Sequence, residues 1–184
     1  MARSASALRG QILDAALNLF AIHGYRGTSL HDIATVVGCS KASLLYHFAG
    51  KDAILTELLS PAREALVELD AELAGLGDDR VAETAVTGYV DLVLRFRREV
   101  KILFQNVTET LCHPVLADVP EMADRLVAAL AGRSTDPKHL VTAHMVLGAV
   151  FVTCAGDPDV PADALREELI HGALRTLDRA HRPS

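Results

Sequence analysis

Apolar residues recur at every third or fourth position along most of this 184-residue chain, and no segment shows the convincing alternation of apolar and polar residues that a strand needs. The first run spans residues 6–23 and ends at Gly24, a residue that commonly stops a helix. Because 50% of the residues are hydrophobic, the chain can bury a substantial core. The pattern predicts an all-α protein.

Two short helices are predicted next, on either side of a glycine. Ser29 can cap one helix by accepting from the amide of Asp32, whose carboxylate reaches back, and Gly38 ends that helix. Ser40 can cap the following helix, Lys41–Phe48. Helices this short are marginal alone in water, so they must be held by packing against each other and against the first helix.

The helix over residues 41–48 has an apolar and a polar side. Leu44 and Phe48 stand at i and i+4, so we expect both to point into the protein. Five residues lie on its other sides: Lys41, Ala42, Ser43, Tyr46 and His47. They could meet phosphates and base edges in a DNA major groove. An ordinary solvated helix is the alternative, which the helix–glycine–helix spacing disfavours.

Charge is unevenly distributed along the chain. Residues 1–55 contain five Lys or Arg and three acidic residues, a net charge of +2. Since the whole chain carries −6 at pH 7, the remainder carries −8. A small cationic excess suits a segment that approaches phosphates, whereas the acidic remainder does not.

Other classes of protein are disfavoured by the sequence. Cys39, Cys112 and Cys154 are odd in number and widely spaced, so we expect neither a disulfide framework nor a metal site, and no cofactor. The most apolar stretch, 140–156, is shorter than a usual membrane span, and the N-terminus is unlike a secretory signal. A cytoplasmic protein without a membrane partner is expected. The sequence contains no Gly-x-Ser-x-Gly, P-loop or His-Glu-x-x-His motif, so an enzyme is not expected.

The run GYRGTSLHDIATVVGCSKASLLYHFAGKDAIL, residues 24–55, closely resembles the DNA-binding segment of the TetR family of bacterial transcriptional regulators. The shared parts are Gly-Tyr, Thr-Ser, Asp-Ile-Ala, Gly-x-Ser, Leu-x-Tyr-His-Phe and Lys-Asp-x-x-Leu, in that order. The resemblance implies a three-helix DNA-binding head with a helix-turn-helix over residues 1–50, and a helical ligand-binding and dimerisation body over residues 51–184. It also implies a homodimer that usually represses transcription until a small molecule binds.

The resemblance also implies which residues of the third helix contact DNA. Lys41, Ala42 and Ser43 match the positions, at the start of the recognition helix, where base edges are met. Tyr46 and His47 match positions near the end of that helix that contact chiefly the DNA backbone.

Three further DNA contacts are implied outside that helix. Thr28 and His31 match positions that touch phosphate or adjacent bases, and Lys51 matches a lysine at the start of the fourth helix, where free amides already favour an anion. The chain departs from the family pattern at two positions. Leu45 stands where many members have an aromatic residue, and Cys39 where a small aliphatic residue is common.

Beyond residue 55 the resemblance is architectural, and the helices are predicted from spacing alone. A fourth helix is expected over residues 51–73, with a kink or break at Pro61, which lacks an amide donor. Further helices are expected over 81–98 and 121–131, with a less regular stretch between them, and residues 133–137 form a break.

The last two helices are expected to form a dimer interface. Residues 140–155 are apolar nearly all round, as suits a helix between a core and a partner. The expected interface residues are Val146, Val150, Leu165, Leu169, Ala173 and Leu177. The resemblance implies that these helices pair with their copies, so that two heads read a palindromic operator in double-stranded DNA. A monomer whose last helix closes its own core is the alternative.

A ligand cavity is expected among the body helices. Aromatic residues are scarce at 4%, which predicts a mainly aliphatic cavity and an unidentified hydrophobic ligand without strong charge. The candidate lining residues are Tyr89, Phe96, Phe104, Asn106, Glu109, His113, Met122, His144, Met145 and Phe151. Plain core packing is the alternative for these residues. The rival function is that of a ligand-independent DNA-binding or interaction protein, or of an activator.

Overall fold

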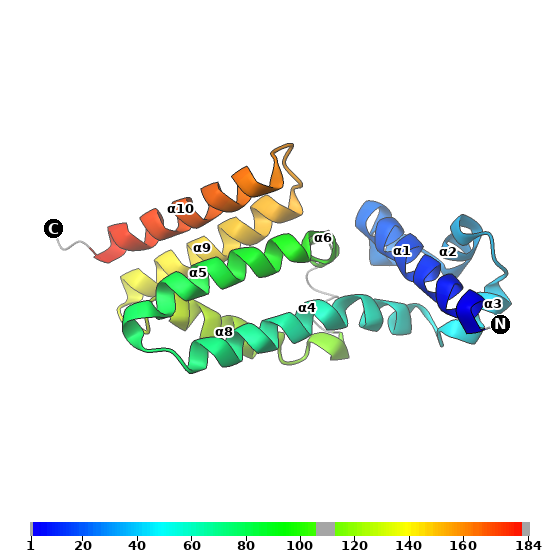
Figure 1. The fold of residues 1–184 in the computed structure, drawn as a ribbon, viewed down its shortest axis with the longest axis horizontal. Coiled ribbons are helices and arrows are strands. Elements are labelled where there is room, and N and C mark those ends of the chain that lie inside the picture. Colours follow the sequence, from blue (N-terminus) through cyan, green and yellow to red (C-terminus); the bar gives the residue numbers. More distant parts are fainter. Residues whose placement is uncertain (1, 106–112, 182–184) are drawn as a thin grey trace.

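The computed structural model describes residues 2–105 and 113–181, and every regular element in these ranges is helical. Figure 1 shows α1 (Ala2–Gly27), α2 (Leu30–Val37) and α3 (Lys41–His47) gathered at one end of an elongated molecule. The long helix α4 (Lys51–Ala74) leads from this head into a body of further helices at the other end. The predicted all-α fold, with an N-terminal helical head and a helical body, is confirmed.

The caps that the sequence indicated bound the head helices, although α1 begins at Ala2 rather than at residue 6. The main part of α1 ends at Gly24, whose φ of 75° and ψ of 163° are not helical. The hydroxyl of Ser29 accepts from the amide of Asp32, and the Ser29 amide donates to the Asp32 carboxylate at 2.8 Å. Gly38 ends α2 in the left-handed region, at φ 74°, and the Ser40 hydroxyl caps α3.

Six helical segments follow the head and α4 in the described ranges. They are α5 (Asp78–Arg95), α6 (Arg97–Gln105), the short 3-10 helix η1 (Pro114–Leu116), α8 (Val119–Leu130), α9 (Pro137–Ala155) and α10 (Ala162–His181). The single helix expected over 81–98 is interrupted, because Phe96 takes a non-helical backbone conformation at φ −110° and ψ 31°. Part of the stretch expected to be irregular is therefore the separate helix α6.

The buried residues form two cores that meet along α4. The head core joins α1, α2 and α3 to the first turns of α4, through Ile54, Leu55 and Leu59, and it also takes in Ile102 of α6. The body core includes Leu69 of α4 together with residues of α5, α8, α9 and α10. The first turns of α4 thus pack with the head, although a domain boundary at residue 50 stays a prediction.

The six dimer residues expected from the sequence are buried or half-buried in the single chain, and their contact with a second copy stays a prediction. Leu169 is half-buried and packs against the body core, Leu165 is buried, and the other four are buried within that core: Val146, Val150, Ala173 and Leu177. The helices α9 and α10 that carry these residues pack against each other, and both also pack against α5. Four of the six, Val146, Val150, Leu169 and Ala173, also line an open groove between α9 and α10.

The outer side of α9 remains apolar and exposed. Val141, Met145 and Val152 are exposed by 60%, 62% and 51% respectively. With a mean hydropathy of 1.4, α9 is also the one described helix that could cross a bilayer by length and composition, a test that core helices of water-soluble proteins pass as well.

Candidate DNA interface and ligand cavity

Helix α3 is fastened to the head by two buried side chains. Leu44 is 0% exposed and Phe48 is 3% exposed, and both belong to the head core. The guanidinium of Arg9 on α1 lies 4.6 Å from the centre of the Phe48 ring and pairs with the carboxylate of Glu57 on α4. The position of α3 is therefore set by contacts from α1 and α4 as well as from α2.

The residues predicted to contact DNA lie on the opposite side of α3. Lys41 and Ala42 are exposed, Ser43 and His47 are half-buried, and Tyr46 is 85% exposed. The Tyr46 and His47 rings meet edge to face with their centres 5.3 Å apart. This arrangement leaves donors and an aromatic face available on the surface, while the DNA contacts themselves stay a prediction.

Two further predicted contacts lie at or near the start of α2 and differ in exposure. His31 is on the surface. Thr28 is only 2% exposed, and its hydroxyl donates to the carbonyl of Gly24 at 3.0 Å. The Thr28 side chain therefore stabilises the turn between α1 and α2, and its contact with phosphate stays a prediction.

Lys51 has a structural role that the sequence did not indicate. Its ammonium donates to the carbonyls of Tyr25 and Thr28 at 2.6 and 2.8 Å and lies 4.3 Å from the centre of the Tyr25 ring. The Tyr25 hydroxyl in turn donates to the Asp52 carboxylate. Burial lowers the pKa of Lys51, although Asp52 partly offsets this effect. Lys51 thus ties the end of α1 to the start of α4, and a phosphate contact there stays a prediction.

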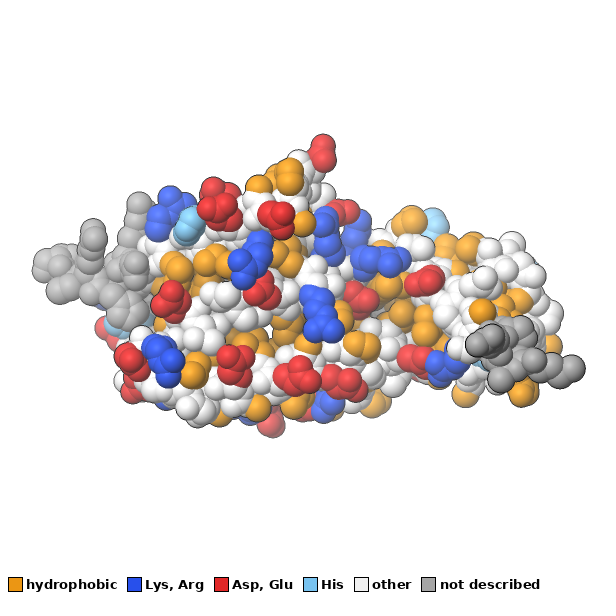
Figure 2. Space-filling view, in the orientation of Figure 1, with side chains coloured by type: hydrophobic (Ala, Val, Ile, Leu, Met, Phe, Trp, Pro, Cys, Tyr) orange, Lys and Arg blue, Asp and Glu red, His pale blue; other side chains and the backbone are white. Residues whose placement is uncertain are grey.

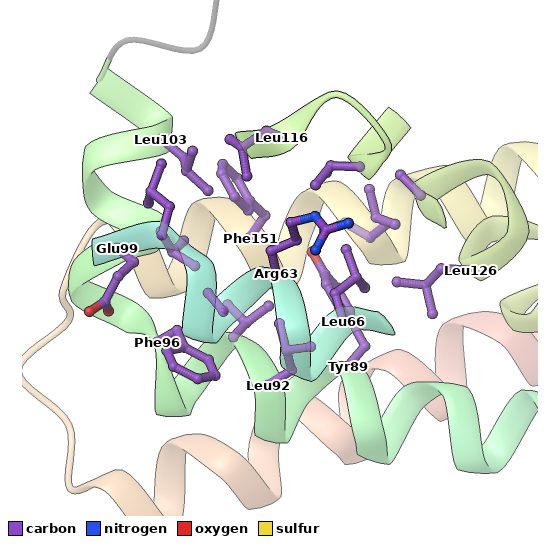
Figure 3. A pocket seen from close by; sticks show the side chains of 17 residues that line it. Arg63, Leu66, Tyr89, Leu92, Phe96, Glu99, Leu103, Leu116, Leu126 and Phe151 are labelled. Atoms are coloured by element: carbon purple, nitrogen blue, oxygen red, sulfur yellow. The ribbon is translucent and has the colours of Figure 1, made fainter. Parts of the chain in front are cut away.

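The body contains an apolar cavity of about 290 Å³, shown in Figure 3. Residues from α4, α5, α6, η1, α8 and α9 surround it, including Leu59 and Leu66 of α4. On α4, therefore, the cavity lies between the last residue of the head core, Leu59, and the first of the body core, Leu69. Its walls are mainly aliphatic, as predicted.

Three of the ten residues proposed for the ligand cavity line it. Tyr89, Phe96 and Phe151 are among its walls. The hydroxyl of Tyr89 donates to the carbonyl of Leu147 at 3.0 Å, and burial raises its pKa, so this phenol is neutral at ordinary pH. Asn106 and Glu109 lie outside the described residues.

The other five proposed residues do not line the cavity. Phe104 and His144 are exposed, and Met122 is buried but is not among the residues that line the cavity. His113 caps η1 by accepting from the amide two residues on. Met145 lies on the outer side of α9, along a shallow groove beside α10. These assignments are corrected because helical spacing alone does not tell which side of a body helix faces the cavity.

Two charged cavity residues were missed, Arg63 on α4 and Glu99 on α6. The Arg63 Nε donates to Asp118 Oδ1 at 2.9 Å, and its Nη2 donates to the second oxygen. The hydrogen bond from Arg63 lowers the pKa of Asp118, whereas burial raises the pKa of Glu99. A signal for Arg63 existed in its spacing from Leu59 and Leu66, which places it on their face of α4.

The described residues do not suggest a reactive thiol or a metal site. Cys39 is half-buried, Cys154 is buried, and burial raises the pKa of the Cys154 thiol. Among the side chains that the structure describes, no three His, Cys, Asp or Glu gather closely enough to hold a metal ion.

The fold and the site together define a helix-turn-helix protein with a separate, cavity-bearing helical body. The model of the family described as "Bacterial regulatory proteins, tetR family" matches residues 12–58, which span α2, α3 and their supports in α1 and α4. The chain belongs to the TetR family, as its resemblance indicated.

Relatives in sequence are named as regulators. The transcriptional regulator RutR of Escherichia coli K12 is 33% identical over 128 residues, which covers 70% of this chain and 57% of RutR. The match thus spans little more than half of that relative's length. IcaR of Staphylococcus aureus strain Newman, a negative transcriptional regulator of a biofilm operon, is 49% identical over 47 residues, 26% of this chain and 25% of IcaR. Both relatives are thus named as transcriptional regulators.

Solved structures share the fold along almost the whole chain. The probable transcriptional regulatory protein RHA5900 has a TM-score of 0.73 at 21% identity, with 92% of this chain and 98% of that chain covered. At this level of identity the likeness supports the arrangement of head and body.

Proposed function

We propose that this protein is a cytoplasmic transcriptional repressor that binds a palindromic operator as a homodimer and leaves it when a small hydrophobic ligand occupies the body cavity. The observation that carries the proposal is the anchoring of α3, whose Leu44 and Phe48 are buried while Tyr46 stands almost fully in solvent. IcaR, which matches over a short span, is named a negative regulator, and this supports repression.

The side chains exposed on and around α3 suit a DNA major groove. A recognition helix contacts base edges through its first turn and the DNA backbone through its neighbours, and here the first turn carries Lys41, Ala42 and Ser43. Ala42 is small enough for close approach or for contact with a thymine methyl group. The net charge of +2 over residues 1–55 favours phosphates, whereas Figure 2 shows acidic and basic side chains interspersed over the rest of the face in view.

A dimer is proposed because one three-helix head buries too little surface for tight, specific binding. The exposed apolar residues Val141, Met145 and Val152 on α9 are our candidates for contact with the second copy. Two heads held one turn of DNA apart would read a palindrome together.

Release is proposed to work through the helices that surround the cavity. On α4, Pro61 stands between the head core and the body core, so a ligand beside this helix can change its tilt and with it the separation of the two heads. Helix α6 offers a second connection, because Arg98 donates to Asn18 and Gln105 donates to the Ala21 carbonyl, both on α1. The ligand then favours a population that cannot enter successive major grooves.

Selection of bound duplexes from random DNA by the full chain tests the proposal. Enrichment of a palindrome with half-sites about one helical turn apart is the expected result. Failure to enrich any sequence would overturn it.

The alternative is a ligand-independent DNA-binding protein or an activator. Measuring the thermal stability of the protein in the presence of each member of a library of hydrophobic small molecules distinguishes this alternative from a ligand-released repressor. A true inducer raises the melting temperature and weakens operator binding together, because the two effects are thermodynamically linked. Operator binding that no stabilising compound alters would favour the alternative.

A further inference from the structure

The apolar cavity has a single basic residue and a single acidic residue among its described lining residues, Arg63 and Glu99. Figure 3 shows the Arg63 guanidinium among the apolar side chains, whereas the Glu99 carboxylate points away from them. The cavity is therefore apolar apart from the side chain of Arg63, which is 34% exposed and pairs with Asp118.

The Arg63 guanidinium is held by one edge, which leaves its other edge available. Arginine has five N–H donors in a planar fork. Nε and Nη2 donate to the two oxygens of Asp118, so this pair is bidentate and fixes the plane of the group. Nη1 has no acceptor among the residues that the structure describes, and its two donors lie beside the remaining N–H of Nη2. A planar acceptor with two oxygens matches that free edge.

We propose that the cavity binds an amphipathic monocarboxylic acid, with its apolar tail among the walls and its carboxylate on the free edge of Arg63. The inference rests on the proposed function, since it names the class of the ligand, and it replaces the expectation of a ligand without strong charge. Asp118 acts as a positioning residue, because it orients the guanidinium without contacting the tail.

The charges of the cavity favour one carboxylate over other polar groups. A cationic ligand would meet Arg63 at short range and be repelled. A phosphate monoester carries close to two negative charges at pH 7 and would leave more charge uncompensated than one carboxylate would, because Asp118 already takes part of the Arg63 charge. Glu99 does not oppose a carboxylate strongly, since its own carboxylate points away from the cavity.

Octanoate and octan-1-ol provide a matched pair of probes, since they have the same chain length and differ in charge. We expect the full chain at pH 7.5 to bind octanoate at least about tenfold more tightly than octan-1-ol, the effect of a hydrogen bond to a charged group. Affinity should rise about fourfold for each added methylene until the cavity is full. Isothermal titration calorimetry measures both quantities.

The variants Arg63→Gln and Arg125→Gln make the assignment specific. Arg125 on α8 pairs with Asp70 on α4, with Nε and Oδ1 also 2.9 Å apart, but it does not line the cavity. Arg63→Gln should reduce the preference for octanoate to about onefold and leave octan-1-ol binding unchanged, whereas Arg125→Gln should keep the wild-type preference.

Each other outcome has a distinct meaning. Equal binding of both probes by the wild type overturns the inference, and so does an octanoate preference that survives Arg63→Gln. In either case the proposed function keeps its expectation of a neutral hydrophobic ligand. Absence of binding by both probes also overturns it. The operator selection is independent of these titrations, so a failure to bind DNA would count against the proposed function alone.

Discussion

Neighbouring residues of α3 carry separate tasks, one in stability and one in binding. Leu44 is 0% exposed and Tyr46 is 85% exposed, although only one residue lies between them. Leu44→Ala should therefore lower the free energy of unfolding by about 2–5 kcal/mol. Tyr46→Ala should change it by less than about 0.5 kcal/mol. Thermal unfolding of the two variants measures this contrast.

The same Tyr46→Ala variant should weaken operator binding about fivefold, because the loss of one hydrogen bond costs about 1 kcal/mol. Fluorescence anisotropy with an operator duplex measures the affinity. Tyr46→Phe is the matched control that separates the hydroxyl from the ring. An affinity unchanged in both variants would remove Tyr46 from the DNA interface.

Residue-scale prediction from the sequence worked best for positions whose role depends on near neighbours. Leu44 and Phe48 were recognised as anchors because their spacing alone places them on one side of a helix. Lys51 looked like a phosphate ligand, but its two carbonyl partners lie 23 and 26 residues earlier in the chain. The place of Arg63 beside the cavity could be inferred from its spacing on α4, but its partner Asp118 could not, since Asp118 is 55 residues away.

At the scale of elements, the N-terminus of α2 depends on the charge of Asp32. The hydrogen bonds from Ser29 lower the pKa of this carboxyl, so the folded state binds its proton less readily than the unfolded state. Its stabilising effect is therefore present above the unfolded pKa, about 3.9, and is lost as the pH falls through the lower, folded value.

Asp32→Asn should consequently be less stable than the wild type at pH 7, and the difference should shrink as the pH falls below about 3.9. Urea unfolding at a series of pH values measures it. The control for general charge effects is Asp14→Asn, because Asp14 is an exposed acidic residue of α1. A difference that stays constant across the series would contradict the role of the Asp32 charge.

Helix boundaries were predictable where a cap marks them. Ser29, Gly38 and Ser40 act within a few residues of themselves, so the short head helices could be placed from the sequence. The end of α5 at Phe96 has neither glycine nor proline to mark it, and the expected helix ran on into the start of α6. Local spacing does not show that break.

Helix α4 contains a proline at the place where its packing changes from the head core to the body core. Pro61 lacks the amide that would donate to the carbonyl one turn earlier, and an interior proline costs about 3 kcal/mol relative to alanine. Pro61→Ala should raise the melting temperature by several degrees, at about 2–4 °C per kcal/mol. A stiffer α4 should also reduce the fold by which octanoate weakens operator binding.

Val67→Ala is the control for the Pro61 variant, because Val67 is also exposed on α4 but has the backbone amide that proline lacks. It should leave both the melting temperature and the octanoate response close to the wild type. A Pro61→Ala protein that melts no higher than the wild type would show that the chain stores no strain at this position.

At the scale of the whole molecule, the interface between two copies could not be located by counting apolar residues. The stripe that includes Leu165, Ala173 and Leu177 has the same spacing whether it faces its own core or a partner, and in the single chain all three residues are buried. What distinguishes the outer surface of α9 is exposure, which only the packed molecule reveals.

Met145→Glu should therefore separate the copies without unfolding the chain. Met145 is 62% exposed, so a carboxylate there stays hydrated in a monomer, but in a symmetric pair it would face the same patch on the partner and repel its copy. Sedimentation should show a monomer, helical content should persist, and operator affinity should fall by at least about tenfold because one head binds alone. Val67→Glu is the control, because Val67 is also exposed but lies on α4, and this variant should remain dimeric. A Met145→Glu protein that is still a dimer would place the interface away from this side of α9.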